Sequence, residues 1–75
     1  MSGSSSVWMI YDHPRSNPKA YVARRFNVSN RGLILTEDMI TSNDIDKLRI
    51  WMVMIGTTPM APQNYFDPKI LEGWE

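Results

Sequence analysis

Two short apolar stretches near the start of the chain predict neighbouring β-strands. Residues 7–11 are apolar and rich in strand-forming side chains, and a His-Pro pair stops the run. Residues 12–19 contain two prolines and an asparagine, which predict a loop. Over residues 20–28 a period-two pattern places Val22 and Phe26 on one face, which we expect to pack on the core.

A turn signal and two further apolar segments predict the rest of a sheet. Residues 29–32, with the sequence Ser-Asn-Arg-Gly, predict the tight turn of a hairpin. A third strand is then expected over residues 33–36 and 39–40, with a bulge or a break at residues 37–38. A last strand is expected over residues 69–74, anchored by an isoleucine and a tryptophan.

The best-marked element is a helix between the third strand and the last one. Apolar residues recur there at steps of three, four and three, which predicts one buried stripe along a helix. Ser42 or Asn43 can cap its N-terminus, and Gly56 can end it. The stripe consists of Ile45, Leu48, Met52 and Ile55.

The second half of this helix is apolar on its other sides too. A helix that is apolar all round is buried all round, and a chain of 75 residues has little with which to bury it. Either the end of the helix lies in an interface with a partner, or residues 50–55 form a buried strand. In the first case, the expected partner or dimer interface consists of Trp51, Met52, Met54 and Ile55.

Together these elements predict the α+β class, with a small, mainly antiparallel sheet of three to five strands and one helix packed across it. Residues 1–6 are rich in Gly and Ser and are expected to form a flexible tail, and residues 7–75 a single domain. We expect no signal peptide, because no basic region precedes an apolar stretch. No apolar run approaches the roughly 20 residues that a membrane span needs.

Composition limits how such a domain can be stabilised. A domain of this size buries only about 60% of the surface that its unfolded chain exposes, so its stability is marginal. The sequence contains no cysteine, which excludes disulfides and thiolate metal sites and favours a cytoplasmic location. One histidine with scattered carboxylates matches no metal-ligand spacing, so we expect neither a metal nor another cofactor. We therefore expect self-association or a partner protein to supply the additional stability that the small core lacks.

Asp12 and His13 form the pair that most suggests acid–base catalysis. A general base needs an orienting partner, but neighbours along a strand point to opposite faces, and we expect Pro14 to hold His13 extended. No cysteine nucleophile, serine elbow or phosphate-binding glycine loop accompanies them. We therefore expect no catalytic residues and no enzymatic activity.

A basic strand raises an alternative, a regulatory module that binds nucleic acid. Arginines can contact phosphates while aromatic rings on a sheet stack with bases. Against this function, the net charge is zero at pH 7, and adjacent arginines on a strand divide between its two faces. The candidate basic surface consists of Arg15, Arg24, Arg25 and Tyr21.

Three short motifs resemble those of a group of short, uncharacterised bacterial and phage-type proteins. These motifs are the Tyr-Asp-His-Pro of residues 11–14, the Tyr-Val-Ala-Arg of residues 21–24 and the Ile-Leu-Glu-x-Trp of residues 70–74. The resemblance spans most of residues 8–74. It implies a stand-alone small bacterial domain and no particular activity.

The expected function is that of a small non-catalytic protein-binding domain, which self-associates or docks on a host or bacterial protein. Six methionines and three tryptophans supply more adaptable apolar surface than one small core needs. Nucleic-acid binding is the weaker alternative, and no contact with a membrane is expected.

Overall fold

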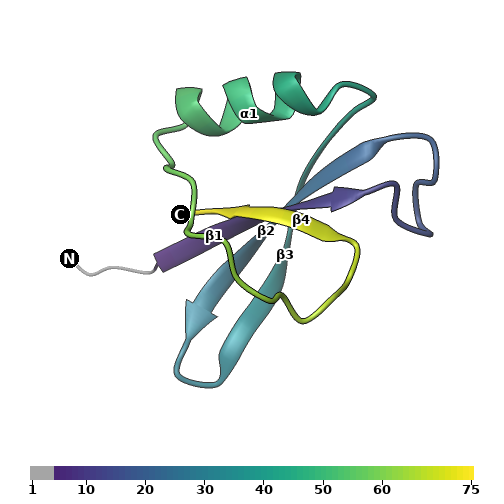
Figure 1. The fold of residues 1–75 in the computed structure, drawn as a ribbon. Coiled ribbons are helices and arrows are strands. Elements are labelled where there is room, and N and C mark those ends of the chain that lie inside the picture. Colours follow the sequence, from purple (N-terminus) through teal and green to yellow (C-terminus); the bar gives the residue numbers. More distant parts are fainter. Residues whose placement is uncertain (1–4) are drawn as a thin grey trace.

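The computed structural model describes residues 5–75, which form four strands and one helix (Figure 1). The strands make one antiparallel sheet in the order β3-β2-β1-β4, and α1 lies across one face of it. The predicted α+β class is therefore confirmed. The elements are β1 (Ser5–Asp12), β2 (Tyr21–Ser29), β3 (Gly32–Ser42), α1 (Ile45–Met54) and β4 (Ile70–Trp74).

The first strand begins earlier than the sequence pattern predicts. Residues 1–4 of the predicted tail lie outside the described residues. Ser5 and Ser6, the last residues of that tail, instead pair with Val28 and Asn27 of β2. Every residue of β1 therefore takes part in the ladder with β2.

The central strand β1 is buried on both faces, so the domain has a core on each side of its sheet. Alternate residues from Val7 to Tyr11 point to one side, and Trp8 and Ile10 point to the other. The core around Trp8 and Ile10 packs against α1. The other core is covered by residues 57–69, which cross the opposite face of the sheet (Figure 1).

Both faces of β2 also contribute to these cores. Val22 and Phe26 are buried on the predicted core face, but Ala23 on the other face is fully buried as well. Ala23 packs with Leu48 and Met52 beneath α1. The prediction of one core face was thus incomplete, because the alternation within a strand does not show which distant segments cover each side.

The predicted hairpin and bulge are both present in β3. Ser29 pairs with Gly32 across a two-residue turn, where Gly32 adopts a φ of 108° that would strain any residue with a side chain. Further along, the register shifts so that Arg25 of β2 lies opposite residues 36–38 of β3. The hydroxyl of Thr36 donates a 2.9 Å hydrogen bond to the carbonyl of Arg25 and so holds the bulge in place.

The helix begins after a different cap from the two that the sequence suggested. Asp44 is the N-cap, and its carboxylate accepts a 3.0 Å hydrogen bond from the backbone N–H of Asp46. Ser42 and Asn43, the predicted caps, lie before it. The hydroxyl of Ser42 instead accepts a 3.1 Å hydrogen bond from the backbone N–H of Asp44, which orients the cap itself.

The second half of the predicted helix is helical, so the alternative of a buried strand over residues 50–55 is wrong. Gly56 then adopts a φ of 91°, the left-handed conformation that commonly ends a helix. The backbone N–H and the hydroxyl of Thr57 both donate to the carbonyl of Met52, at 3.0 and 2.6 Å. These bonds satisfy a carbonyl that the end of a helix would otherwise leave open.

The two edges of the sheet differ in how far they are covered. Thr58 and Glu75 exchange two backbone hydrogen bonds beside β4, and the N–H of Met60 donates to the carbonyl of Gly73 at 2.9 Å. Strand β3 has no neighbour on its outer side among the described residues. The open edge of the sheet is therefore β3.

Candidate functional site

The outer side of α1 is an exposed apolar surface. The inner side of the helix carries Leu48 and Met52, which are fully buried against the sheet. The outer side carries five large hydrophobic residues, which we call the helix patch. They are Ile50 (58% exposed), Trp51 (48%), Val53 (64%) and Met54 (71%) of α1, together with the C-cap residue Ile55 (43%) that follows it.

Three of the four predicted interface residues belong to the helix patch, namely Trp51, Met54 and Ile55. The prediction is wrong for Met52, whose side chain is 0% exposed and forms part of the core. Met52 follows Leu48 by about one helical turn, so both side chains face the sheet. An interface built on this helix therefore uses its outer side and leaves Met52 in place.

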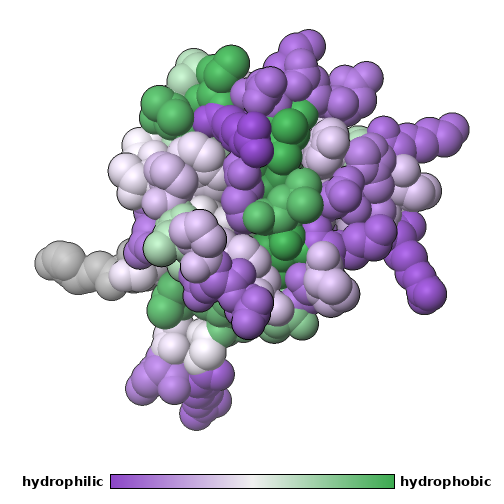
Figure 2. All heavy atoms as spheres, viewed as in Figure 1, coloured by the Kyte–Doolittle hydropathy of each residue, from purple (hydrophilic) through white to green (hydrophobic). Residues whose placement is uncertain are grey.

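The helix patch is free of charge. The charged residues of α1 are Asp46, Lys47 and Arg49, and all three belong to its first half. Hydrophobic side chains gather at the surface around the other end of the helix, at the upper left of Figure 2. An exposed, uncharged patch that contains tryptophan and methionine is typical of surfaces that contact other proteins.

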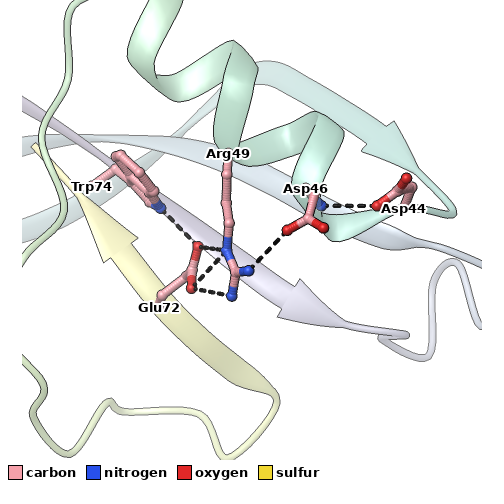
Figure 3. A network of polar contacts seen from close by, with 5 residues as sticks. All are labelled: Asp44, Asp46, Arg49, Glu72 and Trp74. Carbon is pink, nitrogen blue, oxygen red and sulfur yellow. Dashed lines mark hydrogen bonds and ion pairs between the residues drawn. The ribbon is translucent and has the colours of Figure 1, made fainter.

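An ion-pair cluster fixes α1, and with it the helix patch, to the sheet (Figure 3). The guanidinium group of Arg49 donates to both carboxylate oxygens of Glu72 on β4 at 3.0–3.3 Å, and to Asp46 at 3.1 Å. Glu72 also accepts a 3.0 Å hydrogen bond from the indole N–H of Trp74. Partial burial raises the pKa of Glu72, but the bonds from Arg49 and Trp74 outweigh it and hold the pKa below its ordinary value.

Replacing Glu72 with glutamine should lower stability at neutral pH by less than about 1 kcal/mol, because the ion pair is partly exposed. The pKa of Glu72 is lower in the folded protein than in the unfolded chain, so its contribution is present above the unfolded value, near 4.5. That contribution is lost as the pH falls through the folded value. Urea unfolding across this range should therefore show a shallower loss of stability in acid for the variant than for the wild type.

Glu37→Gln is the charge-matched control for this experiment, since Glu37 is an exposed residue of the bulge without an ion pair among the described residues. If the free energy of unfolding falls equally steeply with decreasing pH in Glu72→Gln and in the wild type, the assigned role of Glu72 is contradicted. A change of the same size in Glu37→Gln would show that net charge alone is responsible.

The four residues of the predicted basic surface do not lie together. Arg15 and Arg24 line the same hollow on the face of the sheet opposite α1. Tyr21 packs into the core on the helix side. Arg25 also points to the helix side, where its guanidinium group forms an ion pair with Asp38 at 2.6 Å. The prediction of one basic surface is therefore wrong, because the alternation of β2 divides its members between two faces.

Asp12 and His13 lie close together, contrary to the prediction. Nδ1 of His13 is 2.6 Å from Oδ1 of Asp12, because His13 leaves the strand with a φ of 47° and is not held extended by Pro14. Their side chains are 46% and 40% exposed, and the ring of His13 packs 4.6 Å from that of Tyr21. Neither residue lines the hollow. The pair is thus an exposed local contact at the end of β1.

The open edge carries a second set of exposed apolar side chains, which the sequence pattern did not single out as a surface. Glu37 and Asp38 interrupt this set at the bulge. Bulges and charges hinder an edge strand from pairing with another chain. The helix patch, which no charge interrupts, is therefore the more continuous docking surface. The apolar residues of the edge are Leu33, Ile34, Leu35 and Met39, which are 41–53% exposed.

Comparison with known proteins found no family, no curated protein and no solved structure that matches the chain. The resemblance to short bacterial and phage-type proteins stays a prediction. Within residues 5–75, no helix is long and apolar enough to cross a bilayer. In the same part of the chain, no three or more His, Asp or Glu side chains converge so as to hold a metal ion.

Proposed function

We propose that the chain is a non-catalytic protein-interaction domain, which contacts its partner through the helix patch. The observation that carries this proposal is the exposure of five large apolar side chains on α1 and at its C-cap. Only Leu48 and Met52 of the helix are buried against the sheet. A small domain gains little stability from its own core, so this amount of apolar surface in water favours a partner that covers it.

A second copy of the chain is the partner that we propose first. The chain has no net charge at pH 7, so two copies approach each other without long-range repulsion. The helix patch contains no charged side chain, so two patches can meet about a two-fold axis without burying like charges. Trp51 and Met54 are also of residue types enriched at the centres of interfaces.

Sedimentation velocity over a range of protein concentrations tests this proposal. The wild type should approach the mass of a dimer as its concentration rises. Trp51→Ser should weaken the association about 30-fold, the loss expected for a tryptophan at the centre of an interface. Because Trp51 is 48% exposed, the variant should still fold.

Ile34→Ser is the matched control, since Ile34 is an apolar residue of the β3 edge that is 53% exposed. It should dimerise like the wild type. If all three proteins stay monomeric, a second copy is excluded as the partner. If Trp51→Ser then also captures the same proteins as the wild type in equal amounts, the helix patch is not an interaction surface.

Nucleic-acid binding by a basic strand has less support, since Arg25 and Tyr21 lie on the opposite face from Arg15 and Arg24. A cytoplasmic location remains part of the proposal, because a chain without cysteine suits a reducing compartment.

A further inference from the structure

A hollow of about 550 Å³ lies on the face of the sheet opposite α1. Its volume is in the range of roughly 300–1,000 Å³ that is typical of sites for small molecules. Tyr11 and Phe26 line it from the strands, and both are 8% exposed. Phe66 lies edge-on to Phe26 with ring centres 6.0 Å apart, and Phe66 as a whole is 64% exposed. The hollow therefore has a buried aromatic base and an open aromatic ring beside it.

Three positive side chains surround these rings, against one negative side chain. The cations are Arg15, Arg24 and Lys69, and the anion is Asp67. None of the three cations forms an ion pair within residues 5–75, whereas Arg25 and Arg49 both do. The only polar side-chain contact of Arg24 in this region is a 3.4 Å hydrogen bond to the hydroxyl of Ser16. In a protein of zero net charge, the hollow is thus a local positive site.

Tyr11, which lines the hollow, adds a hydroxyl group to this site. This hydroxyl makes no hydrogen bond to the described residues. No fully buried side-chain polar atom in this part of the chain lacks a partner, so the hydroxyl of Tyr11 is not sealed off from solvent. Burial raises the pKa of Tyr11, and the carboxylate of Asp67 raises it further against the opposing charge of Arg24. A phenol hydroxyl is protonated at neutral pH, so Tyr11 can donate a hydrogen bond to a ligand in the hollow.

We propose that this hollow binds one nucleotide, with its phosphate held by Arg15, Arg24 and Lys69 and its base stacked on Phe66. Guanidinium groups bind phosphate through parallel hydrogen bonds, and an exposed aromatic ring accepts the flat face of any base. The hydroxyl of Tyr11 supplies a further donor to a phosphate oxygen. The site does not involve the helix patch, so this inference is independent of the proposed protein interaction.

The single carboxylate in the hollow distinguishes a nucleotide from an acidic peptide as the occupant. Asp67 is oriented by a 2.8 Å hydrogen bond from the backbone N–H of Lys69. Its oxygens can accept hydrogen bonds from the amino group of a base or from a ribose hydroxyl. A glutamate-rich peptide has no flat group to cover the ring of Phe66. A free nucleotide and a nucleotide within a single strand present the same chemistry to this site.

Titration of the ¹⁵N-labelled full-length chain, followed by amide chemical shifts, tests the proposal. The probes are adenosine 5′-monophosphate, adenosine, inorganic phosphate, a short oligoadenylate and a glutamate-rich peptide. We expect saturable shifts around residues 11–16 and 66–69 with the monophosphate, and weaker binding as the salt concentration rises. Arg24→Gln and Phe66→Ala should each weaken binding about tenfold, since each removes one charge-assisted contact or one stacking contact.

Arg31→Gln is the matched control, because Arg31 is an exposed arginine in the turn between β2 and β3 and does not line the hollow. It should bind like the wild type, and dispersed amide spectra will show that every variant is folded. Equal binding of monophosphate and oligoadenylate at these residues indicates a free nucleotide, and much tighter binding of the oligomer indicates a single strand. No saturable binding of either, equal binding of inorganic phosphate, tighter binding of the peptide, or no effect of Arg24→Gln would each overturn the proposal.

Discussion

Met52→Ala is expected to lower the free energy of unfolding by about 2–5 kcal/mol, whereas Met54→Ala should change it by less than about 0.5 kcal/mol. The two substitutions remove the same atoms, but the first side chain is 0% exposed and the second is 71% exposed. Met52 fills the core with Leu48 and Ala23, so its truncation leaves a cavity. Met54 loses few contacts, because most of its surface is already in water. Urea denaturation followed by tryptophan fluorescence measures both changes.

The comparison should be made at protein concentrations low enough to keep the chain monomeric, because association adds to apparent stability. Under those conditions, equal losses in the two variants would contradict the orientation of α1 described above. At higher concentrations, Met54→Ala should also weaken self-association. The two methionines thus separate the side of the helix that holds the fold together from the side proposed to bind a partner.

The elements that local signals control were predicted well from the sequence. The turn at residues 29–32 and the bulge at residues 37–38 depend on a few neighbouring residues, and the structure contains both. Ile70 and Trp74, the anchors expected in the last strand, are buried at 6% exposure each. The division of Arg24 and Arg25 between two faces also follows from strand alternation alone.

The orientation of α1 was harder to predict, because its second half is apolar on every side. The three-four-three spacing places Met52 in the buried stripe, as the structure has it, but it also places there Ile55, which is 43% exposed. The orientation depends on Leu48, one turn before Met52, and on the small side chain of Ala23 opposite both. The N-cap was missed for a related reason, since Ser42, Asn43 and Asp44 are all good caps and only the end of β3 decides among them.

The hollow could not have been predicted in full, because its residues come from separate segments of the chain. Arg15 and Arg24 stood out as charges, but Phe66 belongs to a proline-rich connection without periodicity, and the pattern assigns Lys69 to the last strand. Only the return of residues 57–69 across the sheet brings these side chains beside Tyr11. No local pattern carries that information.

Gly73→Ala is expected to destabilise the domain by about 1–3 kcal/mol, because it crowds the core on the face of the sheet opposite α1. A Cβ atom at this position would lie 2.8 Å from Sδ of Met60 and 3.2 Å from the hydroxyl of Tyr65. The connection passes this close because the N–H of Met60 is bonded to the carbonyl of Gly73. The added methyl group must therefore displace the thioether of Met60, a shift that the nearby hydroxyl of Tyr65 and Sδ of Met9 restrict. Urea denaturation of the variant and of the wild type measures the loss.

A double-mutant cycle tests whether crowding is the cause of that loss. Met60→Ala removes the sulfur that the new methyl group would meet, so the double variant should lose at least about 0.5 kcal/mol less than the sum of the single losses. Gly73→Ala combined with Met54→Ala is the control, and those effects should add, because Met54 lies beyond the opposite face. Additivity in both pairs would contradict crowding. Glu72 and Trp74 contact residues on the α1 side of the sheet. Gly73, which lies between them, leaves room for Met60 on the opposite face. This part of β4 therefore needs side chains on the α1 side and none on the opposite face.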